Sequence, residues 1–70
     1  MHPRDDAANL HLRTRLDGAF AMARGDAREW VTGLLLQLEA AIDAQDLAAL
    51  TVLRRDLHAA LDAFEASHVT

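Results

Sequence analysis

The chain lacks several residue types that small proteins use to stabilise themselves or to carry out chemistry. It has no cysteine, which excludes disulfides, thiolate chemistry and cysteine-ligated metal centres. It has only three aromatic residues, Phe20, Trp30 and Phe64. A chain of 70 residues without covalent cross-links must therefore build its core from aliphatic side chains, near the lower size limit for a self-sufficient domain.

Proline and long apolar runs are also scarce. The single proline is Pro3, and the longest uncharged apolar stretch spans residues 30–38. That stretch is much shorter than the ~20 residues that a membrane-spanning helix needs. Residues 1–6 lack the apolar run of a signal peptide. We expect a soluble, cytoplasmic protein with no membrane partner.

Lysine is absent as well, so arginine supplies every basic side chain, and the formal net charge is −4. Residues 1–28 hold five Arg against four Asp, whereas residues 29–70 hold two Arg against seven acidic residues. A protein whose main partner is a phosphate backbone usually carries a basic face or tail. The charge therefore disfavours a nucleic-acid partner.

What the chain has in abundance is leucine and alanine, within a hydrophobic content of 51%. These residues favour helices, and they fall on helical spacing. The pattern predicts an all-α fold in one domain, residues 1–70, with helices at about 6–23, 27–44 and 47–66. The last two should form an antiparallel hairpin over about residues 26–66, and the three-helix unit is expected to dimerise into a larger helical bundle.

The first helix, 6–23, has an apolar face at steps of three and four residues. Its members are Ala8, Leu12, Leu16, Ala19, Phe20 and Ala23. Pro3, Asp5 and Asp6 are expected to provide a rigid entry and negative charge at the helix N-terminus. Arg15 lies near the apolar face, so it must pair with an acid or extend its guanidinium to solvent.

Gly25 and Asp26 mark the end of the first helix. Glycine suits the left-handed residue that follows a helix, and Asp26 suits the N-cap of the next one. Glu29 then takes the position of the second member of a capping box. We expect the second helix to begin at this point.

The phase of the apolar residues predicts a break within 26–66. The stripe of the second helix comprises Ala27, Val31, Leu34, Leu38 and Ala41, widened by Trp30, Leu35 and Ile42, and that of the third comprises Leu50, Leu53, Leu57, Leu61 and Phe64. On one continuous helix the two stripes would be offset by roughly 120°, so one partner could not cover both. Asp46 is the natural N-cap after the break. The link has neither Gly nor Pro, which leaves a bent continuous helix as the alternative.

Several residues at the edges of these stripes or outside them are candidates for a protein interface. They are Trp30, Leu36, Val52, Arg54, Ala59 and Ala63. Small side chains opposite the leucine stripe of the third helix would let another helix approach closely; the alternative is that alanine merely fills exposed helical positions. Arg54 and Trp30 are residue types that contribute strongly to interfaces. For Arg54 we favour a position on the core, with its guanidinium paired to an acid such as Asp43 or Asp46.

The end of the third helix carries His58, Asp62, Glu65 and His68 on one flank. The spacing Glu65-x-x-His68 matches the Glu-x-x-His of ferritin-like di-iron helices. The first helix offers no matching set, so we expect a solvated helix end, with a weak attraction between His58 and Asp62, and no metal.

No catalytic pattern is present. Ser67 lies at the end of the last helix, and the three glycines are too dispersed for a phosphate-binding loop. We expect neither an enzyme nor a cofactor.

The favoured function is that of a small protein-interaction module. We expect an inhibitor, antiactivator or adaptor of bacterial or phage type that sequesters a larger protein through a helix face. The protein itself is expected to be a homodimer. One alternative is a dimeric DNA-binding regulator that uses Arg13, Arg15, Arg24 and Arg28. A further alternative is a metal-binding four-helix protein formed by dimerisation.

Overall fold

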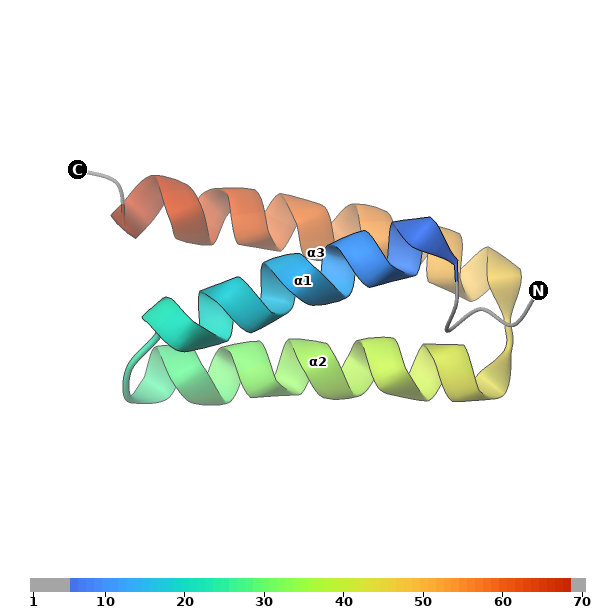
Figure 1. The fold of residues 1–70 in the computed structure, drawn as a ribbon, viewed down its shortest axis with the longest axis horizontal. Coiled ribbons are helices and arrows are strands. Elements are labelled where there is room, and N and C mark those ends of the chain that lie inside the picture. Colours follow the sequence, from blue (N-terminus) through green and yellow to red (C-terminus); the bar gives the residue numbers. More distant parts are fainter. Residues whose placement is uncertain (1–5, 69–70) are drawn as a thin grey trace.

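A computed structural model describes residues 6–68, which form three helices: α1 (Ala7–Met22), α2 (Asp26–Ala44) and α3 (Leu47–His68). The antiparallel hairpin of α2 and α3 is evident in Figure 1, where α1 crosses the hairpin diagonally. The N-terminal end of α1 lies beside α3 and its C-terminal end beside α2 (Figure 1). The predicted all-α fold is confirmed, and each helix boundary lies within two residues of its prediction.

Asp6 caps α1. Its carboxylate Oδ1 accepts a hydrogen bond from the backbone N–H of Ala8 at 2.8 Å, which satisfies one of the free donors at the helix N-terminus. Pro3 and Asp5, which were expected to share this role, lie outside the described residues.

Gly25 makes the turn between α1 and α2 possible. Its φ of 59° and ψ of −128° are accessible essentially to glycine alone. The positive φ agrees with the left-handed residue predicted from the sequence at this position. The prediction that Asp26 is the N-cap and Glu29 the second member of a capping box was wrong, because Gly25 takes the N-cap position and no side chain caps the helix. The Gly25 carbonyl accepts from the N–H groups of Arg28 and Glu29 at 3.0 and 3.3 Å, so Asp26 is already the first residue of the helix. Asp26 and Glu29 place negative charge in the first turn, where the helix dipole favours it.

The break between α2 and α3 lies where the phase of the leucines predicts it. Gln45 adopts the left-handed conformation, with φ of 56° and ψ of 30°, and its N–H donates to the Ile42 carbonyl at 3.1 Å. The carboxylate of Asp46 accepts from the N–H of Ala49 at 3.0 Å, so its predicted capping role is confirmed. The continuous bent helix is therefore excluded, and a glutamine has the conformation that glycine usually adopts at a helix end.

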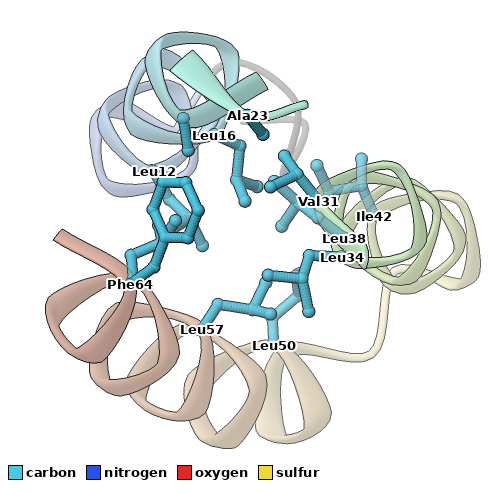
Figure 2. Packing of buried hydrophobic residues seen from close by; sticks show 12 residues of the cluster. Leu12, Leu16, Ala23, Val31, Leu34, Leu38, Ile42, Leu50, Leu57 and Phe64 are labelled. Carbon is cyan, nitrogen blue, oxygen red and sulfur yellow. The ribbon is translucent and has the colours of Figure 1, made fainter. Parts of the chain in front are cut away.

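The core consists of aliphatic side chains and one phenylalanine between the three helices (Figure 2). Its members are Leu12, Leu16, Ala19, Ala23, Val31, Leu34, Leu38, Ile42, Leu50, Leu57, Leu61 and Phe64. Ala8 was wrongly placed in this face: it is exposed, while the neighbouring Asn9 is 2% exposed. Because α1 crosses the hairpin obliquely, its first turn presents the Asn9 edge to α3.

None of the three helices in the described part of the chain combines the length and apolarity needed to span a bilayer.

Candidate interaction surfaces

Arg15 is the centre of a polar cluster between α1 and α3. Its Nη2 donates to Asp62 Oδ1 at 2.9 Å and to Glu65 Oε1 at 2.8 Å, and its Nη1 lies 2.7 Å from His58 Nδ1. The side chain of Arg15 is 20% exposed, whereas those of Asp62 and Glu65 are 72% and 48% exposed. The hydrogen bond with Asp62 is the largest influence that raises the pKa of Arg15. We call Arg15, His58, Asp62 and Glu65, together with His11, the α1–α3 seam.

Asp62 and Glu65 are exposed, as expected for a solvated helix end, but the interpretation missed that this flank pairs with a cation from another helix. Residues on successive turns of α3 converge on a cation from another helix, which spacing within α3 could not reveal. The side chain of His68, the fourth member of the predicted flank, lies outside the described residues. Among the residues that the structure describes, no group of three or more His, Asp and Glu side chains is arranged to hold a metal ion.

His58 is half-buried in this seam, and its ring stacks on that of His11 with a centroid distance of 5.8 Å and an interplanar angle of 29°. Burial lowers the pKa of His58 below its ordinary value, and the charge of Arg15 lowers it further. The neutral imidazole is favoured here because a protonated ring would lie against a guanidinium.

Arg54 also faces α1. Its Nη1 donates to the side-chain oxygen of the buried Asn9 at 2.9 Å. The expected pairing with Asp43 or Asp46 was wrong, because the edge of α3 that carries Arg54 lies against the first turn of α1 rather than against the hairpin link. The same contact explains how Asn9 is tolerated inside an aliphatic core, since a buried amide needs a hydrogen-bond partner.

Arginines also connect α1 to α2. Arg13 Nη2 pairs with Glu39 Oε1 at 2.8 Å, with both side chains about half exposed, and the Arg28 guanidinium carbon lies 4.1 Å from the centroid of the Phe20 ring. Three of the four arginines proposed for DNA binding, Arg13, Arg15 and Arg28, therefore make intramolecular contacts.

Other exposed side chains on α2 and α3 are apolar. Trp30 on α2 lies against Phe64 on α3, with ring centroids 5.8 Å apart, yet remains 41% exposed. On the outer side of α3, Val52 is 50% exposed, and Ala59 and Ala63 are exposed. We call these four exposed residues, Trp30, Val52, Ala59 and Ala63, the α2–α3 face.

Two of the six predicted interface residues do not belong to the α2–α3 face. Arg54 turns toward α1, as its contact with Asn9 shows. Leu36 is 62% exposed, but six residues separate it from Trp30, which places it about 120° away around α2. Single exposed leucines are common on soluble proteins. The six candidates predicted from the sequence therefore lie on different sides of the bundle.

Other exposed apolar side chains were not identified from the sequence. Leu10 and Met22 on α1 are 52% and 51% exposed, and Leu47 at the start of α3 is 66% exposed. All three lie outside the stripes of helical spacing, which was the available signal.

Comparison of the chain with protein-family models, curated proteins and solved structures gave no match.

Proposed function

We propose that this protein is a regulatory binding module that attaches to a larger protein through the α2–α3 face and acts by sequestering it. The observation that carries the proposal is Trp30, an indole that remains 41% exposed although Phe64 lies directly beside it. Tryptophan is among the residues that contribute most to protein interfaces when a partner desolvates it.

The shape of the α2–α3 face suits a helix. Ala59 and Ala63 are one turn apart on the outer side of α3, and their small side chains allow the backbone of a partner helix to approach closely. Val52, about two turns before Ala59 on α3, and Trp30 on α2 provide larger apolar groups. This combination favours an amphipathic helix that docks along the hairpin, a common mode of peptide recognition.

The charge of the hairpin indicates the chemistry of the partner. From Asp26 to His68 the chain carries three Arg against eight Asp and Glu. Charge complementarity steers association and discriminates against wrong partners. The expected partner segment therefore has an apolar seam flanked by Lys or Arg.

A second copy of the chain is the competing occupant. Two copies that meet through their hairpins would bring acidic surfaces together, which opposes association more strongly at low salt. The homodimer expected from the sequence remains a prediction, and the experiment below separates it from a complex with another protein.

The test is site-specific photocrosslinking in the organism that makes the protein. A photoreactive amino acid replaces Trp30, and the peptide attached to it is sequenced. We expect a segment of another protein with an apolar helical pattern and basic flanks. In pull-downs, Val52→Asp should reduce recovery of that protein at least about tenfold, since a charge on a desolvated interface costs more than about 1.4 kcal/mol.

Leu10→Asp is the matched control, because Leu10 is as exposed as Val52 but lies on α1. It should leave recovery unchanged. A crosslink to a second copy of this chain, or equal recovery with Val52→Asp and the unmodified protein, would contradict the proposal.

A further inference from the structure

The short contact between Arg15 and His58 restricts the protonation state of the histidine. A guanidinium group can only donate hydrogen bonds. At 2.7 Å from Arg15 Nη1, the Nδ1 atom of His58 must therefore supply a lone pair. The contact requires a neutral imidazole whose proton is on Nε2.

The groups around His58 make its protonation unfavourable. On α1 it faces Arg15 and His11, and on α3 it lies near Arg54 and Asp62. Arg15, His11 and Arg54 oppose a positive charge on the ring, and Asp62 favours it. Burial is the largest influence and also lowers the pKa of His58.

We propose that the α1–α3 seam is an acid-sensitive latch: protonation of His58 breaks its hydrogen bond with Arg15, sets like charges against one another and loosens the attachment of α1 to α3. The inference concerns the α1 side of the bundle and is independent of the α2–α3 face. Histidine is suited to such a role because it titrates near neutral pH.

The direction of the pH effect follows from the difference between the folded and unfolded chains. The pKa of His58 is lowered by folding from an ordinary value of about 6.5, so below that pH the unfolded chain binds more protons at this site. The contribution of His58 to stability is therefore complete above about pH 6.5. It is lost progressively as the pH falls from there toward the folded pKa.

The first test compares chemical unfolding of the unmodified protein with that of His58→Asn between pH 8 and pH 5. The amide side chain introduced in this variant can offer an acceptor in the position of Nδ1 but does not titrate. As the pH falls, the unfolding constant of the unmodified protein should rise relative to that of the variant. The total rise should be about tenfold for each pH unit by which folding lowers the pKa of His58.

His11→Gln is the control. It removes the stacked ring but retains the bond between Arg15 and His58, so its unfolding constant should still rise on acidification relative to that of His58→Asn. If His58→Asn and the unmodified protein have parallel pH profiles, the latch is ruled out.

A second measurement does not depend on the folding of any variant. Nitrogen NMR of the imidazoles should show an unprotonated Nδ1 for His58 at pH 8 and a pKa below that of free histidine. Amide hydrogen exchange, corrected for its intrinsic pH dependence, should accelerate in α1 before α2 as the pH falls. A His58 pKa at or above the ordinary value, or simultaneous loss of protection in both helices, would overturn the inference.

Discussion

The two sides of α3 are held in different ways. Toward α1, arginines connect the helices: Arg15 reaches two carboxylates and an imidazole, and Arg54 reaches a buried amide. Toward α2, the rings of Trp30 and Phe64 are in contact. Directional polar contacts specify how α1 docks, whereas the apolar side leaves an indole exposed. The polar side thus contributes to how the helices dock, and the other side carries the exposed indole on which the proposed function rests.

The first prediction is that α1 and α2 depend on the same aliphatic core for their attachment to α3. Leu57→Ala and Leu38→Ala should each lower the free energy of unfolding by about 2 to 5 kcal/mol, because both side chains are buried and truncation leaves a cavity. Leu16→Ala on α1 should cost a similar amount, as measured by urea denaturation. A cost for Leu16→Ala well below those of the other two would mean that α1 is held mainly by its polar contacts.

The second prediction concerns the buried end of the polar side. Asn9→Ala removes the acceptor of Arg54 and should lower the free energy of unfolding by about 1 to 3 kcal/mol, since the guanidinium then lacks its partner. Arg54→Met should also destabilise the protein. Arg55→Met is the matched control, because the Arg55 side chain is 76% exposed, and it should change stability by less than about 0.5 kcal/mol.

The third prediction tests the exposed end of the polar side. Arg15→Met should lower the free energy of unfolding by about 1 kcal/mol, because the two carboxylates that Arg15 meets are largely exposed and their attraction is screened. The difference from the unmodified protein should shrink in 1 M salt, where the Debye length is about 3 Å. A difference that persists undiminished at high salt would indicate that packing of the Arg15 stem, and not charge, is what matters.

The fourth prediction concerns the link that places α3 beside α2. Gln45→Gly should raise the thermal midpoint slightly, with a gain in the free energy of unfolding of less than about 1 kcal/mol. Glycine relieves the left-handed strain at φ 56°, but its greater entropy in the unfolded chain offsets part of this gain. Gly25→Ala tests the other turn and should be destabilising, because its φ and ψ are unfavourable for any side chain. If both variants shifted the midpoint in the same direction, this account of the turns would be wrong.

The smallest expected effect is on the apolar side. Val52→Asp should change the free energy of unfolding by less than about 0.5 kcal/mol, since Val52 is 50% exposed and lies outside the core. If Val52→Asp also loses the partner in pull-downs, this result would show that the substitution affects binding and not stability. A large loss of stability would instead show that Val52 is covered in solution, as it would be in a dimer, and the thermal midpoint would then depend on protein concentration.

The helices, the leucine stripes and the positions of both turns could be predicted from the sequence, whereas the residue that caps α2 and the left-handed Gln45 could not. The features that could be predicted depend on neighbours a few residues apart: the 3.6-residue period places Leu50, Leu57 and Leu61 on one face, and Gly25 and Asp46 act on the backbone beside them.

Which polar side chains meet depends on how the helices pack. Arg15 and Glu65 are 50 residues apart, and Arg54 and Asn9 are 45 apart. Their contacts depend on the oblique crossing of α1 over the hairpin (Figure 1), which no local spacing encodes. The same crossing buries Asn9 in place of Ala8 and turns Arg54 away from Trp30. Periodicity shows which face of a helix is apolar, but the packing angle of the helices decides which flank faces a partner helix and which faces solvent.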